Sequence, residues 1–138
     1  MTTPKIVLDS NIFVAAGFSR RSHSARLLDR VRAGELRLMW HEATVAETRH
    51  QLEKIPPLSW QPVAVLFAGR NQFAGELPLA DYLFIADPDD RKFAALAEQV
   101  GALLVTNDEH LLSAAARLTV PVLTPAAAVA WLSAGESP

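Results

Sequence analysis

The sequence predicts an α/β fold with a mainly parallel sheet that helices cover on both faces. Short apolar runs alternate with helical segments along the 138 residues, and the connections between them are short. The first run, Lys5–Leu8, is apolar at successive positions, as expected of a strand that is buried on both faces. A chain of this length is expected to form one domain over residues 1–138, with an ordered core of about 4–133.

The first half of the chain contains alternating strand and helix patterns with clear stop signals. Gly34 and the Pro56-Pro57 pair are expected to end the second and third helices. The expected elements are a strand at Lys5–Leu8, a helix from Ile12 capped by Ser10 or Asn11, a helix capped by Ser22 or Ser24 that ends at Arg32, a strand at Leu36–Trp40, and a helix from Glu42 to about Lys54.

The second half repeats this alternation after a segment, Leu58–Ala80, that has no clear pattern. Its most regular part is Arg91–Val100, where apolar residues recur with helical spacing before Gly101. The other expected elements are a helix at Trp60–Ala68, a strand or strand-like segment at Tyr82–Ala86, a strand at Ala102–Val105, a helix at Glu109–Ala116, a strand at Val120–Leu123, and a last helix capped by Thr124 with Pro125 at its first position.

Composition excludes several classes of protein. The chain has no cysteine, which excludes disulfide scaffolds, thiol catalysis and thiolate metal sites. Half of the residues are hydrophobic and 20% are charged, so the chain is not intrinsically disordered. No apolar run is long enough to span a membrane and no secretory signal precedes Asp9, so we expect a cytoplasmic protein.

The net charge of −2 is unevenly distributed along the chain. Residues 20–54 contain eight Lys or Arg and five Asp or Glu, whereas residues 55–138 contain four and nine. This asymmetry fits two differently solvated faces, and it also fits a phosphate-contacting rim beside a cation-binding centre.

Several carboxylates follow, or precede, elements that are expected to end at the same edge of the sheet. Asp9 follows the first strand and Asp108 follows the strand at Ala102–Val105. Asp87, Asp89 and Asp90 precede the helix at Arg91–Val100. Each of these residues has a purely structural interpretation, because aspartate also caps helices and orders turns. Sites in open parallel sheets nevertheless form at the carboxyl ends of the strands.

Carboxylates that share such an edge would repel one another. Two unit charges about 5 Å apart at an effective dielectric constant of about 20 repel by about 3 kcal/mol, so protonation or a bound cation must compensate. With no cysteine and only four scattered histidines, the available ligands are oxygen atoms. Oxygen ligands suit Mg²⁺ or Mn²⁺, which are the usual cations of phosphoryl chemistry.

Four motifs, taken together, resemble the PIN-domain family of metal-dependent ribonucleases, which includes the VapC-type toxins of bacterial toxin–antitoxin pairs. The resemblance extends over nearly the whole chain, and the first and last acidic motifs carry most of it. The motifs are Ile6-Val7-Leu8-Asp9-Ser10-Asn11, Ala46-Glu47, Asp87-Pro88-Asp89-Asp90-Arg91-Lys92-Phe93 and Leu104-Val105-Thr106-Asn107-Asp108.

The resemblance implies a three-layer α/β/α domain whose acidic residues bind one or two Mg²⁺ or Mn²⁺ ions and hydrolyse RNA phosphodiester bonds. The acids that match the family's motifs, and that would serve as catalytic residues and metal ligands, are Asp9, Glu47, Asp90 and Asp108; Asn11 and Thr106 match supporting polar positions. Asp87 is an alternative to Asp90, and Glu42 is an alternative to Glu47.

Other predictions depend on weaker patterns. Arg20 and Arg21, after the first helix, are candidate phosphate contacts, whereas the four histidines lack the spacing of metal ligands and are expected to be ordinary polar residues. A homodimer and a cognate antitoxin are the expected protein partners, beside the RNA substrate.

Two other functions fit parts of the sequence. A haloacid-dehalogenase-like phosphatase also begins with a strand that ends in aspartate, but its second acid would stand where this chain has Asn11. A non-catalytic module that binds metal or RNA would use the same acids without cleavage.

Overall fold

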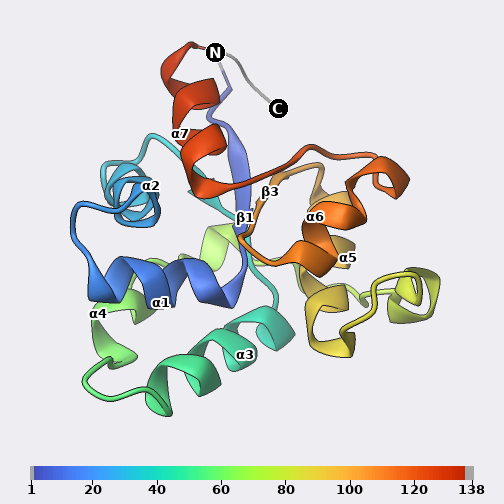
Figure 1. Cartoon of the computed structure of the whole chain (residues 1–138), viewed down its shortest axis with the longest axis horizontal. Coiled ribbons are helices and arrows are strands. Elements are labelled where there is room, and N and C mark those ends of the chain that lie inside the picture. The colour runs from blue at the N-terminus through green and yellow to red at the C-terminus, as the bar shows by residue number, and fades with distance from the viewer. Residues whose placement is uncertain (1, 136–138) are drawn as a thin grey trace.

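The computed structural model describes residues 2–135, which form a four-stranded parallel sheet with helices on both faces (Figure 1). The strands are β1 (Lys5–Leu8), β2 (Arg37–Leu38), β3 (Leu103–Val105) and β4 (Val122–Leu123), in the order β2-β1-β3-β4. The α-helices are α1 (Ser10–Phe18), α2 (His23–Arg32), α3 (Glu42–Glu53), α4 (Gln61–Ala64), α5 (Arg91–Val100), α6 (Glu109–Ser113) and α7 (Pro125–Ser133). Four short 3₁₀ helices complete this part of the chain, namely η1 (Gly69–Asn71), η2 (Leu79–Tyr82), η3 (Pro88–Asp90) and η4 (Ala115–Arg117). The three-layer α/β arrangement predicted from the sequence is confirmed.

The two central strands, β1 and β3, are apolar on both faces because each face packs against a helical layer. Successive side chains of a strand point to opposite faces. Val7 and Leu104 therefore belong to one apolar cluster, whereas Ile6, Leu8 and Val105 belong to the other. This division explains why the strands are continuous apolar runs in the sequence.

Helices α1, α2 and α7, together with the end of α3, cover one face of the sheet (Figure 1). Phe13 of α1, Leu27 of α2 and Leu132 of α7 are buried in this layer. The α7 helix begins as predicted, because the Thr124 hydroxyl accepts a hydrogen bond from Ala127 N and Pro125 occupies the first position.

Helices α5 and α6 cover the other face. Phe93, Leu96 and Ala97 of α5 are fully buried against Leu104 and its neighbours. The helix ends at Gly101, whose φ of 66° lies in the left-handed region that favours glycine. This placement directs the N-terminus of α5 toward the ends of the strands.

Several expected elements differ in extent from those observed. The first helix begins at Ser10 rather than Ile12, with Asp9 at its N-cap position. The helix expected at Trp60–Ala68 is limited to α4, and the strands expected at Leu36–Trp40 and Val120–Leu123 are each reduced to two residues. The helix expected at Glu109–Ala116 divides into α6 and η4.

The strand-like segment expected at Tyr82–Ala86 is wrong. Tyr82 closes the 3₁₀ helix η2, and Ile85 N donates to Tyr82 O at 3.0 Å. Tyr82 and Ile85 are buried while Leu83 is 66% exposed, which is the spacing of a tight turn rather than of a strand.

The single domain predicted for residues 1–138 stays a prediction, and its two ends, residue 1 and residues 136–138, lie outside the described residues. Among residues 2–135, no helix has both the length and the apolar character needed to cross a membrane.

Candidate metal centre

Two acidic side chains lie at the ends of the neighbouring strands β1 and β3. Asp9 follows β1 directly, and Asp108 follows β3 after two intervening residues. The register pairs Leu8 with Val105, so the strand ends lie side by side. The buried Thr106 hydroxyl donates to Asp9 Oδ2 at 2.7 Å and accepts from Asp108 N at 2.9 Å. One threonine therefore fixes the positions of both acid-bearing segments.

A third acid, Asp90, lies at the junction of η3 and α5. Its side chain is buried, with only 7% of the residue exposed. Its Oδ2 atom is buried and has no hydrogen-bond partner among residues 2–135. An unpaired buried carboxylate oxygen is costly, so a proton or a cation must compensate for it. The neighbouring Asp87 accepts a hydrogen bond from Asp89 N at 2.9 Å and caps η3.

A fourth acid, Glu47, reaches the same region from α3. Lys92 Nζ lies 3.4 Å from Glu47 Oε1, and Gln51 Nε2 donates to Glu47 Oε2 at 3.3 Å. The Glu47 side chain is 12% exposed. Glu42, the alternative to Glu47, is exposed in the first turn of α3.

These acids share a cavity of about 220 Å³ at the carboxyl ends of the strands. The residues that line it are Asp9, Ser10, Asn11, Glu47, Gln51, Asp87, Asp89, Asp90, Phe93 and Asp108. The four acids predicted as metal ligands, and the supporting Asn11, therefore meet at one cavity. Thr106 is buried and bonded to Asp9. Asp87 faces the same cavity as Asp90, whereas Glu42 does not line it.

Burial and mutual repulsion raise the pKa of two carboxyls of this cavity, those of Asp9 and Asp90. Burial raises the pKa of Asp9 above its ordinary value, the Thr106 hydroxyl partly offsets this, and the charge of Asp108 raises it further. Burial, followed by the charges of Asp108 and Asp9, raises the pKa of Asp90 to about 8. A divalent cation would reverse both effects, because it favours the ionised carboxylates.

Sequence reasoning missed one residue that lies beside this site, His110. Its Nδ1 atom lies 3.4 Å from Asp108 Oδ1 and 3.8 Å from Asp90 Oδ2. Ligand atoms of His110, Asp87 and Asp90 all lie within 4.8 Å of one another. The signal in the sequence is its position two residues after Asp108 at the start of α6, where the backbone N–H of His110 donates to Asp108 Oδ1.

The candidate phosphate contacts lie elsewhere. Arg20 lines a second cavity, of about 640 Å³, near the end of α1 opposite to Asp9. The nine residues of α1 place these ends about 13 Å apart. Arg21 is exposed and lines neither cavity. Neither Arg20 nor Arg21, the two predicted phosphate contacts, therefore lines the acidic cavity.

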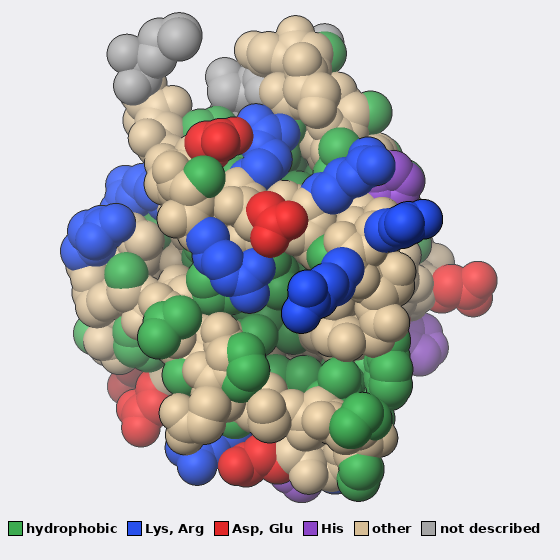
Figure 2. All heavy atoms as spheres, turned by 90° about the vertical axis from the view of Figure 1, so that its left-hand side faces the viewer, with side chains coloured by type: hydrophobic (Ala, Val, Ile, Leu, Met, Phe, Trp, Pro, Cys, Tyr) green, Lys and Arg blue, Asp and Glu red, His purple; other side chains and the backbone are tan. Residues whose placement is uncertain are grey.

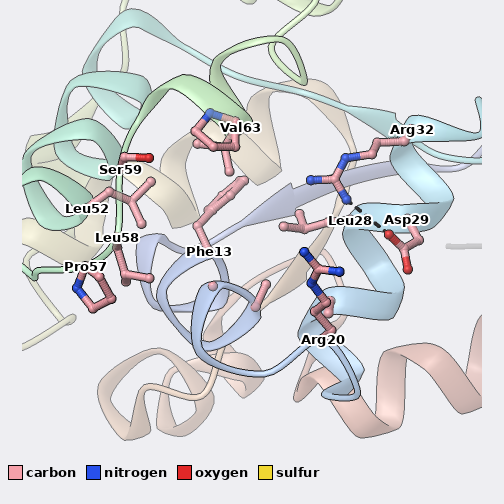
Figure 3. Close-up of a pocket in the computed structure, with 14 residues that line it drawn as sticks. Phe13, Arg20, Leu28, Asp29, Arg32, Leu52, Pro57, Leu58, Ser59 and Val63 are labelled. Carbon is pink, nitrogen blue, oxygen red and sulfur yellow. Dashed lines mark hydrogen bonds and ion pairs between the residues drawn. The ribbon is translucent and has the colours of Figure 1, made fainter.

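The second cavity has an apolar floor and a charged side. Phe13, Leu28 and Leu52 are buried beneath it. Figure 3 shows Arg20 and Arg32 on one side, with Arg32 bonded to Asp29, and Leu52 on the other. Figure 2 shows this face of the molecule, where Lys and Arg side chains gather above a group of apolar side chains.

Comparison with protein families gives one match. Residues 5–110 match the sequence model of the family described as PIN domain. The matched segment begins with β1 and ends at His110, and it includes Asp9, Glu47, Asp90 and Asp108. No curated protein matches the chain.

Comparison with solved structures gives matches to the fold. VapBC2 from Rickettsia felis, solved bound to a DNA fragment from its promoter, has a TM-score of 0.60 and 18% identity over 87% of this chain and 98% of that chain. FitAcB from Neisseria gonorrhoeae has a TM-score of 0.56 and 21% identity over 87% and 97% of the two chains. PAE2754 from Pyrobaculum aerophilum has a TM-score of 0.60 and 20% identity over 96% and 90%. At these identities the matches show a shared fold.

Proposed function

Since the chain belongs to the PIN domain family, we propose that it is a Mg²⁺- or Mn²⁺-dependent endoribonuclease and the toxin of a toxin–antitoxin pair. PIN domains are generally nucleases, and PIN nucleases use divalent metals. The match covers residues 5–110, so it includes every acid of the candidate metal centre. Membership in this family also argues against the interpretation as a haloacid-dehalogenase-like phosphatase.

The observation that carries the proposal is the unpaired Oδ2 atom of Asp90. It is buried beside the cavity that Asp9 and Asp108 also line, and it has no hydrogen-bond partner in the described part of the chain. A cation ligated by this oxygen would satisfy it and would offset the repulsion between the three carboxylates. The donor set is rich in oxygen, which suits Mg²⁺ and Mn²⁺. The residues present therefore fit a divalent cation.

The residues have distinct roles in this proposal. Asp9, Asp90 and Asp108 would hold the cation, and Thr106 keeps Asp9 oriented through its hydrogen bond of 2.7 Å. A cation held there would supply a positive charge beside the scissile phosphate and would favour the deprotonation of a water molecule. Glu47, on the α3 side of the cavity, would orient a water molecule or complete the set of ligands, and Lys92 Nζ pairs with Glu47 Oε1 at 3.4 Å.

A cleavage assay tests the proposal. Purified protein is incubated with single-stranded RNA in Mg²⁺, in Mn²⁺ or in EDTA, and the products are mapped at single-nucleotide resolution. We expect metal-dependent cleavage that EDTA abolishes and that Asp9→Asn reduces by about 100-fold or more, since a ligand of the cation is lost. A parallel assay with single-stranded DNA of the same sequence tests the preference for RNA.

Asp81→Asn is the matched control, because Asp81 is an exposed acid of η2 that does not line the cavity. It should cleave as well as the wild type. Cleavage that survives EDTA and Asp9→Asn would contradict the proposal. Binding of metal and RNA without any cleavage would instead support the alternative, a non-catalytic module that uses the same acids.

The partners follow from the same proposal. VapBC2 is solved bound to DNA from its promoter, and it shares this fold. We therefore propose that this chain also pairs with an antitoxin protein, and we retain the homodimer and the cytoplasmic location as predictions from the sequence. A short reading frame beside the gene, co-expressed with the chain, should suppress the cleavage activity and co-purify with it.

A further inference from the structure

His110 places a nitrogen atom beside two carboxylates of the acidic cavity, although it is not itself among the residues that line this cavity. Its Nδ1 atom lies 3.4 Å from Asp108 Oδ1 and 3.8 Å from Asp90 Oδ2. The ligand atoms of His110, Asp87 and Asp90 lie within 4.8 Å of one another. Opposite ligands of a cation such as Mg²⁺ are about 4.2 Å apart, so small side-chain rotations would bring these atoms around one ion.

A second observation indicates that these atoms face a ligand. Asp90 is 7% exposed, and its Oδ2 atom has no hydrogen-bond partner among the residues described. This oxygen lies 3.8 Å from His110 Nδ1, a separation that is too long for a hydrogen bond. An unpaired buried oxygen and an imidazole nitrogen therefore face the same space without bonding to each other.

The backbone holds His110 in this position. The N–H of His110 donates to Asp108 Oδ1 at 2.7 Å, and Asp108 caps α6. The Asp108 backbone N–H is in turn bonded to Thr106 at 2.9 Å. The imidazole is 54% exposed, so it reaches the rim of the cavity from the solvent side and can turn without disturbing the core.

We infer that His110 is a nitrogen ligand of the cation proposed at Asp9, Asp90 and Asp108, with Asp87 within reach of the same ion, and that it makes this centre prefer first-row transition ions such as Mn²⁺ over Mg²⁺. The inference rests on the proposed function, because it assumes that the acidic cavity binds a divalent cation. An imidazole suits transition ions, whereas Mg²⁺ favours oxygen ligands and retains its water. A site made only of carboxylates would distinguish the two ions less.

Spectroscopy of bound Mn²⁺ tests the ligand directly. Electron spin echo spectra of the Mn²⁺-loaded wild type should contain a nitrogen coupling from a directly bound imidazole. The coupling should change when the histidines carry ¹⁵N, and it should disappear in His110→Gln. His50→Gln is the matched control and should keep the coupling, because His50 is an exposed histidine of α3 that does not belong to the group of ligand atoms formed by His110, Asp87 and Asp90.

Binding measurements test the selectivity without using activity. Dissociation constants for Mn²⁺ and Mg²⁺ are measured by calorimetry for the wild type, His110→Gln and His50→Gln. We expect His110→Gln to weaken Mn²⁺ binding by about 10-fold or more, the range for disturbed metal sites, and to leave Mg²⁺ binding within about twofold. Thermal unfolding with EDTA verifies that the variant is folded.

The failures of the two proposals are distinguishable. If the wild type binds neither ion, both the metal centre and the role of His110 are overturned. If the wild type binds Mn²⁺ without a nitrogen coupling, only the role of His110 is overturned. The same holds if His110→Gln weakens the binding of Mn²⁺ and of Mg²⁺ equally. In that case His110 is an ion-pair partner of Asp90 and Asp108, and the nuclease proposal stands.

Discussion

The Thr106 hydroxyl donates a hydrogen bond of 2.7 Å to Asp9 Oδ2, although the two residues are 97 positions apart in the chain. The same hydroxyl accepts from Asp108 N at 2.9 Å. One fully buried side chain therefore connects the carboxylate after β1 with the backbone after β3. The spacing between these two strand ends is set by this contact as well as by the sheet.

Replacing Thr106 by valine should destabilise the protein while keeping the volume of the side chain. Asp9 Oδ2 and Asp108 N would lose a buried partner, which costs about 1–3 kcal/mol of unfolding free energy. Thr106→Ser keeps the hydroxyl and should lose only about 1 kcal/mol for its missing methyl group. Urea denaturation of both variants measures the difference. Equal stabilities for Thr106→Val and the wild type would show that the bridge contributes nothing.

The ionisation of Asp90 should make the metal-free protein less stable as the pH rises. The carboxyl has an ordinary pKa of 3.8, and in the fold burial and then the charges of Asp108 and Asp9 raise it to about 8. Between these values the unfolded chain has lost the proton that the folded chain retains, so the unfolding free energy decreases with pH. In EDTA, Asp90→Asn should therefore be similar to the wild type near pH 4 and clearly more stable near pH 8.

Thermal unfolding in EDTA across this range measures the effect. Asp81→Asn is the control, because Asp81 is an exposed acid of η2 that does not line the cavity. The stability of this control variant should change with pH in the same way as the stability of the wild type. Parallel curves for Asp90→Asn and the wild type would show that Asp90 does not have a raised pKa.

The Lys92–Glu47 pair should stabilise the metal-free fold more than an exposed ion pair does. Both side chains are mostly buried, with 18% and 12% exposed, and the two atoms are 3.4 Å apart. Lys92→Met leaves the Glu47 carboxylate without the Lys92 ammonium group and should lower the unfolding free energy by about 1–3 kcal/mol. The double variant Lys92→Met with Glu47→Gln should recover part of that loss. A double-mutant cycle from urea denaturation measures the interaction free energy between Lys92 and Glu47. A value near zero would contradict the predicted stabilisation.

Glu98 should hold three segments together above acidic pH. It accepts hydrogen bonds from the Tyr82 hydroxyl at 2.6 Å and from Thr119 N and Oγ1 at 2.6 and 2.7 Å. Burial opposes ionisation, but these donors outweigh it and lower the pKa of Glu98 below 4.5. The stability that ionised Glu98 contributes is therefore present above about pH 4.5 and is lost as the pH falls through the lowered pKa.

Tyr82→Phe tests this contact. It should cost about 1.5–3 kcal/mol near neutral pH, the range for hydrogen bonds to charged groups, and less in acid. Denaturation at several pH values measures the difference from the wild type. A difference that does not decrease below about pH 4 would show that the charge of Glu98 is not involved.

Local sequence patterns predicted the elements with strong local signals. The strand at Lys5–Leu8, the helix at Arg91–Val100 and the helix start at Thr124-Pro125 were each predicted correctly. In each case the pattern of apolar residues, or the capping residue, agrees with the tertiary packing. Such agreement between levels makes an element readable from a single sequence.

The segment at Tyr82–Ala86 shows why other elements were not predictable. Its apolar residues suggest a strand, but only tertiary packing decides that Tyr82 and Ile85 are buried and Leu83 is exposed. The shared cavity of Asp9, Glu47, Asp90 and Asp108 was predictable, because strand ends and helix starts meet at one edge of a parallel sheet. The proximity of His110 to Asp90 was not, because it depends on how α6 and η3 are oriented.

The pairing of β1 with β3 also has a consequence for protein synthesis. β1 is translated well before β3, Asp108 and α6, which lie later in the chain. An unfinished polypeptide on the ribosome has Asp9 but lacks the strand that completes the cavity around it. The acidic cavity in which we propose a cation is therefore complete only after β3 has been translated and the sheet has closed.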